Sequence, residues 1–350
     1  MFLPASFRAR SGTSSLRGRT HEDEKLNKTP TSLVSDGVAV SAYAKLNLTL
    51  EVLGKRPDGY HAIRSIVVPV GLHDDVVVSV SGDGADGDVS LEFVADGADI
   101  SRIGATGDNL AVRAARLFME RTGCHVPLAI RIVKRIPIGG GLGGGSADAA
   151  AVLVGLNSLV TRHSSLVTPL STADLMEMAA MLGSDIPSLV HGGTVVMEGR
   201  GEKVRPLAMA DGRSPIPALP VVLANPGVFV STAEAYRAVR DDLTDTPILG
   251  TIYDTVSRGM DFASVAAALR NDLEDAVLPR HPEIAALAAA MRGAGARAVL
   301  MSGSGATVFA LAEDDEEAER IMRALPAGCW RTLTRLLPDG VMAAHGPLEA

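Results

Sequence analysis

The sequence predicts an α+β protein with two domains. Stretches in which apolar and polar residues alternate indicate β-strands in the first half of the chain. These stretches are 37–54, 63–72, 75–81, 89–94 and 126–134. Segments dense in helix formers lie between or after them. The composition shifts to Pro, Gly and Ser around 208–220, so we place the domains at 37–210 and 211–350.

Helices in the first domain are predicted from caps and apolar spacing. Asp108 or Asn109 can cap a helix that runs to about Thr122. Another helix is expected at 172–182, and the sequence Gly-Ser-Asp-Ile-Pro at 183–187 ends it. Two short strands follow, at 194–199 and 203–206.

The strands at 75–81 and 89–94 are expected to pair with each other. The loop between them is rich in Gly and Asp, which are residues that favour turns. We therefore predict a two-stranded unit at this place in the first domain.

The second domain mixes strands and helices in a way that fits an α+β unit. The predicted elements are a strand at 221–224, helices at 232–243, 262–270 and 282–293, two short strands around a glycine turn within 298–311, a helix at 314–325 and a last strand near 330–337. The sequence has no internal repeats, which argues against a solenoid or propeller.

Residues 1–36 differ from the rest of the chain. Arginines and serines in the first twenty residues partly fit a transit peptide, which would be poor in acidic residues. The segment lacks a sustained amphipathic pattern, and the cluster His21-Glu-Asp-Glu-Lys25 follows directly. We therefore predict a disordered extension, with a targeting segment or an over-called start codon as alternatives.

The composition argues against several classes of partner. The chain has 350 residues, of which 47% are hydrophobic and 3% aromatic, so we expect a large aliphatic core. A net charge of −8 argues against nucleic acid or an anionic membrane surface as partner, and no apolar run is long enough to span a bilayer. Cys124 and Cys329 give neither a zinc site nor a disulfide framework. We expect a cytoplasmic monomer or weak homodimer whose partner is a small molecule.

The chain is organised around the segment Pro137–Asp148, in which six of the seven residues from 139 to 145 are glycine. A predicted strand precedes it, and helix formers at 149–157 follow it. A glycine loop lets backbone N–H groups approach a ligand, and a helix N-terminus adds positive potential there. The segment is therefore predicted to be a phosphate cradle. A flexible linker is the alternative, but linkers are rarely held between an apolar strand and an apolar helix.

Two known phosphate motifs fit this loop in part. The dinucleotide pattern G-x-G-x-x-G begins at Gly139, but no Asp or Glu lies between positions 148 and 174 to hold a ribose hydroxyl. The Walker pattern also begins at Gly139, except that Gly145 stands where that motif needs lysine. The loop is therefore predicted to hold a triphosphate, with its cation supplied from elsewhere in the chain.

Three segments together resemble the GHMP kinases of small metabolites. They are Ala44-Lys-Leu-Asn-Leu48, Pro137–Ala150 and Met301-Ser-Gly-Ser-Gly305. The resemblance runs from about residue 38 to about residue 309. It implies an N-terminal domain like domain 2 of ribosomal protein S5 and a ferredoxin-like C-terminal domain, with ATP on the glycine loop and the substrate between the domains.

Further motifs resemble one branch of that family. They are Asp58-Gly-Tyr-His61, Leu182-Gly-Ser-Asp-Ile-Pro187, Gly199-Arg-Gly-Glu202 and Asn271-Asp-Leu-Glu274. Members of this branch phosphorylate the 2-hydroxyl of a sugar alcohol linked to cytidine diphosphate, in isoprenoid precursor synthesis. The resemblance thus implies ATP and Mg²⁺ as cofactors. The alternatives are a GHMP kinase for mevalonate, homoserine or a sugar, and a non-catalytic nucleotide-binding or oxidoreductase module.

The resemblance assigns ATP binding to the glycine segment. The residues implied are Pro137, Ile138, Gly139, Gly140, Gly141, Leu142, Gly143, Gly144, Gly145, Ser146 and Ala147. Ser146 stands where the Walker serine would be, so it is also the candidate ligand for Mg²⁺; a plain helix cap is the alternative. The sequence departs from the family at Ala147, where a second serine is common.

Lys45 and Asp185 are the predicted catalytic residues. The resemblance makes Asp185 the base that accepts the proton of the substrate hydroxyl; a capping aspartate is the alternative. Lys45 would supply the cation that the glycine loop lacks, although a strand lysine is ordinarily a solvated edge charge. Beside Asp185 it would keep the carboxylate ionised and polarise the attacking oxygen.

Aromatic residues are scarce, so Tyr60 and His61 beside a turn are conspicuous. The resemblance implies that Tyr60 and Tyr236 enclose the cytosine ring, that His61 bonds its edge, and that Asn47 helps to orient the substrate. For Tyr236, ordinary packing of a helical tyrosine is the alternative.

Overall fold

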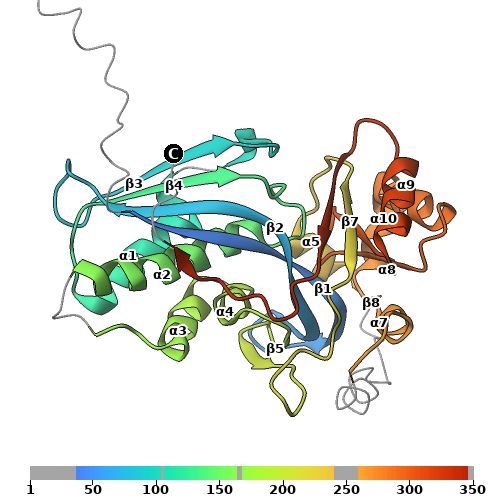
Figure 1. Ribbon diagram of the computed structural model, residues 1–350, viewed down its shortest axis with the longest axis horizontal. Helices are drawn as coiled ribbons and strands as arrows, with labels where there is room; N and C mark the ends of the chain where they lie inside the picture. The colour runs from blue at the N-terminus through green and yellow to red at the C-terminus, as the bar shows by residue number, and fades with distance from the viewer. Residues whose placement is uncertain (1–36, 104–105, 164–167, 240–258, 346–350) are drawn as a thin grey trace, which may run out of the picture.

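The computed structural model describes residues 37–103, 106–163, 168–239 and 259–345. It contains an eight-stranded and a four-stranded sheet, which lie side by side (Figure 1). The extension predicted at 1–36 lies outside the described residues. Helices and strands mix in both halves, as expected for an α+β protein, whereas the domain boundary near 210 stays a prediction.

The first sheet is built on two long strands. Its strands are β1 (Val38–Lys55), β2 (His61–Val80), β3 (Val89–Ala95), β4 (Leu128–Lys134), β5 (Val195–Gly199), β6 (Lys203–Pro206), β8 (Arg270–Asn271) and β12 (Ala344–His345). The main order is β12-β1-β2-β4-β3, with β5 paired to β2 and β6, and with β8 paired to β1. The late strands β8 and β12 thus join a sheet built mainly from the first half of the chain.

The predicted pairing of 75–81 with 89–94 is wrong. The end of β2 pairs antiparallel with β4, and β3 pairs parallel with the other side of β4. Strand β4 takes the central place because it buries Ile130 and Ile132 in the core, whereas β3 is half-exposed along its length. The regions predicted as separate strands at 63–72 and 75–81 also form one continuous strand, β2.

Helices cover one face of the first sheet. They are α1 (Leu110–Thr122), α2 (Gly144–His163), α3 (Thr172–Leu182) and α4 (Ile186–His191), with short 3₁₀ turns at Ile100–Arg102 and Thr106–Asp108. Asn109 caps α1 through its side chain, as predicted, and Ser171 forms a capping box at α3. Helix α2 buries its alanines and leucines against the strands, so its N-terminus is fixed relative to the sheet.

Three strands of the second sheet are buried on both faces, whereas one edge strand is partly exposed. The order of this sheet is β11 (Trp330–Arg335), β7 (Pro220–Asn225), β10 (Val308–Leu311), β9 (Ala298–Met301), and the partly exposed strand is β11. Successive residues of β7 and β10 pack into different cores on the two faces of the sheet. Leu223 and Phe309 pack toward the long strands of the first sheet. Val222 and Val308 pack on the other face, toward the helices of the C-terminal half. The two sheets therefore share an apolar interface that fixes the space between them.

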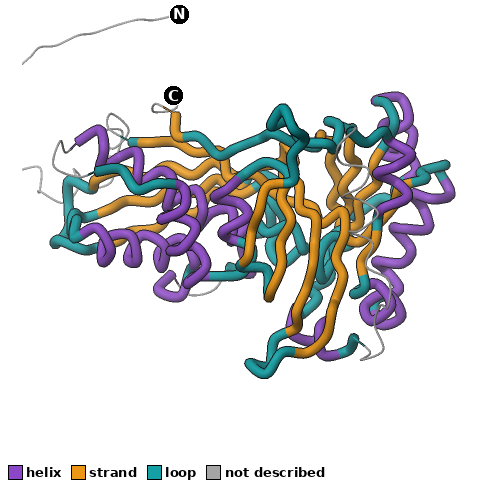
Figure 2. The backbone as a smooth tube through the Cα atoms, turned by 90° about the horizontal axis from the view of Figure 1, so that it is seen from below, coloured by secondary structure: helices purple, strands orange, loops and turns teal. Residues whose placement is uncertain are grey.

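The remaining helices belong to the C-terminal half. They are α5 (Thr232–Arg237), α7 (Phe262–Ala268), α8 (Glu274–Val277), α9 (Pro282–Gly293) and α10 (Asp315–Ala324), with a 3₁₀ turn at Leu278–Arg280. Figures 1 and 2 show α9 and α10 on the outer side of the second sheet, opposite the long strands. The helix predicted at 232–243 begins as expected, and positions 240–243 lie outside the described residues.

Candidate active site

A cavity of about 940 Å³ lies where the glycine loop, the long strands and the C-terminal half meet. Its wall includes most of the glycine segment, the side chains of Lys45 and Asp185, and the aromatic residues Tyr60 and Tyr236. The structure therefore brings together residues that lie almost two hundred positions apart in the sequence. A cavity of this size can hold one ligand of nucleotide size and part of another.

The glycine loop is held against β1. The backbone N–H of Lys45 donates to the carbonyl of Leu142 at 3.0 Å. Gly143 has a left-handed backbone with φ of +73°, and a Cβ there would lie 3.1 Å from Cε of Lys45. Gly141 approaches still more closely, because a Cβ on it would lie 2.2 Å from the carbonyl oxygen of Ser302. Close packing therefore requires glycine at both positions.

Nine of the predicted ATP residues line the cavity, and two do not. Leu142 is fully buried in the core beneath the second sheet, and Ala147 is fully buried against the first. Helix α2 begins at Gly144, so its N-terminal N–H groups and its positive dipole end face the same space. The loop can therefore hold phosphate groups through its backbone.

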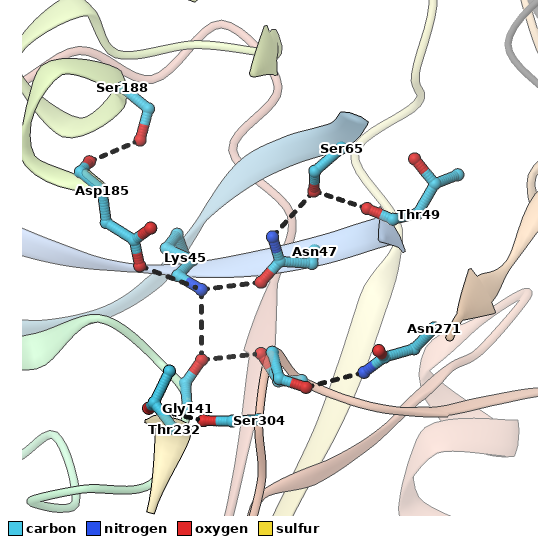
Figure 3. Close-up of polar contacts among 12 residues, drawn as sticks. Lys45, Asn47, Thr49, Ser65, Gly141, Asp185, Ser188, Thr232, Asn271 and Ser304 are labelled. Atoms are coloured by element: carbon cyan, nitrogen blue, oxygen red, sulfur yellow. Dashed lines mark hydrogen bonds and ion pairs between the residues drawn. The ribbon is translucent and has the colours of Figure 1, made fainter. Parts of the chain in front are cut away.

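Lys45 and Asp185 face each other across this cavity (Figure 3). Lys45 Nζ lies 3.5 Å from Oδ2 of Asp185, and the side chain of Lys45 is 5% exposed whereas that of Asp185 is 37% exposed. The ammonium also donates to Oδ1 of Asn47 at 2.6 Å and to the carbonyl of Gly141 at 3.3 Å. A buried cation thus stands next to a carboxylate that a ligand can reach.

Asp185 stands immediately before α4, but its carboxylate does not cap that helix. The side chain makes no capping hydrogen bond, and the Asp185 carbonyl accepts from the hydroxyl of Ser188 at 2.7 Å. Pro187, which needs no N–H partner, stands in the first turn. The carboxylate is therefore left to the cavity, which favours chemistry over the structural alternative for this residue.

Asn47 uses both ends of its amide inside the protein. Its oxygen accepts from Lys45, and its nitrogen donates to the hydroxyl of Ser65 at 2.8 Å. Ser65 in turn donates to the carbonyl of Thr49. Asn47 is 4% exposed yet lines the cavity, so these contacts support a role in holding Lys45 in place, and contact with substrate stays a prediction.

The third glycine-rich motif, 301–305, buttresses the loop from the second sheet. The hydroxyl of Ser302 donates to the carbonyl of Gly141 at 3.0 Å. Asn271 donates to the carbonyls of Met301 and Gly303 at 2.8 and 2.7 Å, and Glu274 accepts from the Met301 N–H at 2.7 Å. The sequence motif at 271–274 is thus explained by the turn that it holds.

The aromatic residues gather at one end of the cavity. The rings of His61 and Tyr236 stack with centroids 5.5 Å apart, and Tyr60 is 55% exposed. Burial, and then the charge of Asp185, raise the pKa of Tyr236, so its hydroxyl stays protonated. The guanidinium of Arg200 lies over the ring of Tyr60 at 5.5 Å. Sequence reasoning missed Arg200 as a site residue, although the motif Gly199–Glu202 contains it.

A buried charge cluster adjoins the start of α2, and sequence reasoning missed it as well. Lys134 Nζ lies 2.5 Å from Oδ2 of Asp74 and 2.7 Å from Oδ2 of Asp148. Burial opposes the charge of Lys134, but the two carboxylates outweigh it and raise its pKa. Burial raises the pKa of Asp148 to about 7, against the lowering effect of the Lys134 ammonium. Lys134 and Asp148 line the cavity.

Ser146 was predicted to be a ligand for Mg²⁺, and this stays a prediction. It lines the cavity in the first turn of α2, half-buried. In the described part of the chain, no group of three His, Cys, Asp or Glu side chains could hold a metal ion.

Family comparisons agree with this geometry. Residues 109–193 match the N-terminal domain of the GHMP kinases, and residues 256–329 match their C-terminal domain. A glycine-rich phosphate loop beside a Lys–Asp pair, on this two-sheet fold, defines an ATP-dependent kinase of small molecules.

The relatives narrow the class. A 4-diphosphocytidyl-2-C-methyl-D-erythritol kinase from Symbiobacterium thermophilum is 43% identical over 84% of this chain and 99% of its own length. The crystal structure of a 4-(cytidine 5′-diphospho)-2C-methyl-D-erythritol kinase superposes with a TM-score of 0.66 at 34% identity, covering 85% of this chain and 98% of the other. The chain belongs to the family of the 4-diphosphocytidyl-2-C-methyl-D-erythritol kinases, within the GHMP kinases.

Fold similarity alone does not separate this family from its neighbours. A homoserine kinase from Cytophaga hutchinsonii superposes with a TM-score of 0.68 over 95% of this chain and all of the other, at 18% identity. It shares the fold, whereas the sequence identity to the erythritol kinases distinguishes the family. In the part of the chain that the structure describes, no helix is long and apolar enough to cross a membrane.

Proposed function

We propose that this chain transfers the γ-phosphoryl group of ATP to the 2-hydroxyl of 4-diphosphocytidyl-2-C-methyl-D-erythritol. The observation that carries the proposal is the pair Lys45–Asp185, 3.5 Å apart at the edge of the glycine loop. Phosphoryl transfer needs an in-line hydroxyl, a proton acceptor and positive charge around the transferring group. The substrate supplies the hydroxyl, and the cavity offers Asp185 as the proton acceptor and Lys45 as the positive charge.

The proton passes to Asp185 in this mechanism. The substrate hydroxyl loses its proton to the carboxylate while its oxygen forms a bond to the γ-phosphorus, and the bond from that phosphorus to the β–γ bridging oxygen breaks to release ADP. Asp185 suits this role because its carboxylate is accessible and makes no helix cap. Lys45, held by Asn47 at 2.6 Å, stabilises charge on the transferring group.

Phosphates would lie on the glycine loop and the N-terminus of α2. There the backbone N–H groups and the helix dipole stabilise negative charge without reorganising during the reaction. Mg²⁺, when bound with ATP, would neutralise phosphate charge, and the Ser146 hydroxyl would contribute one oxygen to it. This metal ligand rests on the position of Ser146 in the cavity wall.

The cytidine part of the substrate would lie at the aromatic end of the cavity. Tyr60 offers an exposed ring face, while Tyr236 and His61, whose rings stack on each other, line the same end and would meet the base with a ring and a ring nitrogen. Arg200, above Tyr60, places positive charge where the substrate carries a diphosphate. Mevalonate, homoserine and a simple sugar have no aromatic base to stack on these rings, so the aromatic end favours the cytidyl substrate over the other GHMP substrates.

The location and assembly are also proposals. Cys124 and Cys329 are both free, as is usual in a reducing compartment, and we infer a cytoplasmic enzyme that is a monomer or a weak homodimer.

ADP release measured against a panel of alcohols tests the function. The panel contains the cytidyl diphosphate of methylerythritol, free methylerythritol, mevalonate, homoserine and galactose. We expect turnover with the first compound, and a much lower kcat/KM when the cytidine diphosphate group is missing. Equal turnover of mevalonate or homoserine would overturn the assignment, and nicotinamide nucleotide binding without ADP release would favour a non-catalytic module.

A further inference from the structure

Asp148, in the wall of the nucleotide cavity, has one carboxylate oxygen without a hydrogen-bond partner. Its side chain is 5% exposed, and Oδ2 accepts from Lys134 at 2.7 Å. Oδ1 is buried and has no hydrogen-bond partner among the described residues, yet Asp148 lines the cavity. A buried polar atom without a partner is costly, and more so when it is charged. A donor on a ligand in the cavity would complete the arrangement.

The position of Asp148 along α2 indicates which part of a ligand it meets. It lies four residues after Gly144, about 6 Å further along the helix axis, and the phosphates are expected at the start of that helix. Gly143 lies against the side chain of Lys45, whereas Gly144 lies toward Lys134, so a phosphoryl group beside Lys45 would be on the other side of the loop from Asp148. A nucleotide whose triphosphate follows the loop would therefore bring its ribose and base toward Asp148.

The walls near this position suit a nucleoside. Lys134 pairs in the sheet with Ala95, so that Phe93 lies two residues away on the neighbouring strand. Phe93 and Ile136 both line the cavity, and Ile136 also packs near Gly144. A polar acceptor among apolar walls is the usual arrangement of a site that orients a flat aromatic ligand by one or two hydrogen bonds.

Asp74 holds the other side of Lys134 and does not reach the ligand. It is fully buried and lies outside the cavity wall. Its Oδ1 accepts from the N–H groups of Arg135 and Ile136 at 2.5 and 2.9 Å, and its Oδ2 accepts from Lys134 at 2.5 Å. Lys134 therefore has a second counter-ion, so Oδ1 of Asp148 is not needed to compensate its charge and can accept a hydrogen bond from a ligand. A metal ion at Oδ1 is disfavoured, because the Lys134 ammonium touches the same carboxylate.

We propose that Asp148 is a nucleotide-specificity residue, whose Oδ1 accepts a hydrogen bond from the nucleoside part of ATP. The donor is either the exocyclic amine of adenine or a ribose hydroxyl, since both can donate a hydrogen bond to a carboxylate oxygen. The inference rests on ATP as the phosphoryl donor, as proposed above. It makes Asp148 a binding residue for the nucleotide, separate from the Lys45–Asp185 pair.

Calorimetry with nucleotide analogues tests this proposal. The ligands are ATP, purine riboside triphosphate, which lacks the amine, and 2′-deoxy-ATP and 3′-deoxy-ATP, which lack one hydroxyl each. The wild-type protein is expected to prefer ATP over one of these analogues by roughly ten- to a hundredfold, the usual value of a hydrogen bond to a charged group. The analogue that loses affinity identifies the donor.

Two matched variants separate recognition from structure. In Asp148→Asn, Lys134 still requires an acceptor, so the amide turns its NH₂ group to the cavity and the preference for ATP should fall to about one. Asp74→Asn removes the same charge from Lys134 without touching the cavity, and it should keep the wild-type preference even if its stability falls. If Asp148→Asn does not fold, Asp148→Glu keeps the charge, displaces the oxygens and should reduce the same preference.

Three results would overturn the proposal. They are equal wild-type affinity for ATP and all three analogues, an undiminished preference in a folded Asp148 variant, and an equal loss of preference in Asp74→Asn. Each differs from a failure of the proposed function, which would appear as no ATP binding, or as no phosphoryl transfer to the cytidyl alcohol.

Discussion

Two buried lysines flank the glycine loop, and their surroundings differ. Lys45 is 4% exposed and Lys134 is 3% exposed, so burial does not distinguish them. Lys134 is held between two buried carboxylates at 2.5 and 2.7 Å. Lys45 has one half-exposed carboxylate at 3.5 Å, and its other contacts are neutral oxygens.

The different surroundings of the two lysines indicate two different roles for lysine in the same cavity. The charge of Lys134 is compensated inside the protein, which links β2, β4 and the start of α2 at the end of the glycine loop. The charge of Lys45 is only partly compensated, so it remains able to stabilise a phosphoryl group. The number and distance of the carboxylates therefore distinguish Lys134, whose charge is compensated within the protein, from Lys45, for which we propose a catalytic role.

The largest expected effect comes from removing each lysine in turn. Lys134→Met leaves Asp74 and Asp148 buried without their cation, so the free energy of unfolding should fall by about 3–5 kcal/mol. Lys45→Met leaves a carboxylate that water can reach, so its stability should change little while turnover falls by about 10²–10³. Denaturant unfolding and turnover are measured on both variants. Equal destabilisation by the two changes would remove the distinction.

A smaller effect is expected at the contact between the loop and Lys45. Gly143→Ala puts a Cβ 3.1 Å from Cε of Lys45 at a φ of +73°, which costs about 1–2 kcal/mol in strain. ATP affinity should fall by roughly tenfold. Gly87→Ala is the control, since its φ is +86° and a Cβ there has no atom within 4 Å. Gly87→Ala should lower the stability of the protein and leave its ATP affinity unchanged. Unchanged ATP affinity in Gly143→Ala would contradict the placement of the phosphates on the glycine loop.

A substitution at the aromatic end of the cavity should change the affinity for the cytidyl substrate and not the affinity for ATP. Tyr60→Ala should weaken binding of the cytidyl substrate by roughly 1–3 kcal/mol, the value of stacking a base on an aromatic ring. ATP affinity of the same variant is the internal control and should not change, because adenine is expected elsewhere. Equal weakening of both ligands, or of neither, would contradict the placement of the cytosine at Tyr60.

The smallest effect is expected from deleting residues 1–36. This segment has no apolar periodicity, so it adds nothing that we expect the core or the cavity to use. Melting temperature and turnover should both remain close to those of the full chain. A large fall in either would show that the extension takes part in folding or catalysis.

The sequence predicted the parts of the site that lie in short motifs. The glycine loop, Lys45 and Asp185 each carry a local pattern, and the helix at 172–182 was found with its bounds. The predicted pairing of β2 with β3 was wrong, because β4, the strand that lies between them in the sheet, comes more than thirty residues after β3 in the chain. Nor could the pattern reveal the Asp74–Lys134 pair, 60 residues apart in the chain, because a charged residue stands next to each of them and the local sequence does not distinguish a buried ion pair from exposed charges.

The measurement that tests the central claim most directly is the single-turnover rate of Asp185→Asn. The substitution keeps the size of the side chain and removes the proton acceptor. Because the carboxylate makes no capping hydrogen bond, melting temperature should be unchanged, and ATP should still bind. We predict a fall in the phosphoryl-transfer rate of about 10²–10⁴, the usual contribution of a general base. A folded, ATP-bound Asp185→Asn protein that transfers the phosphoryl group at the wild-type rate would contradict the account.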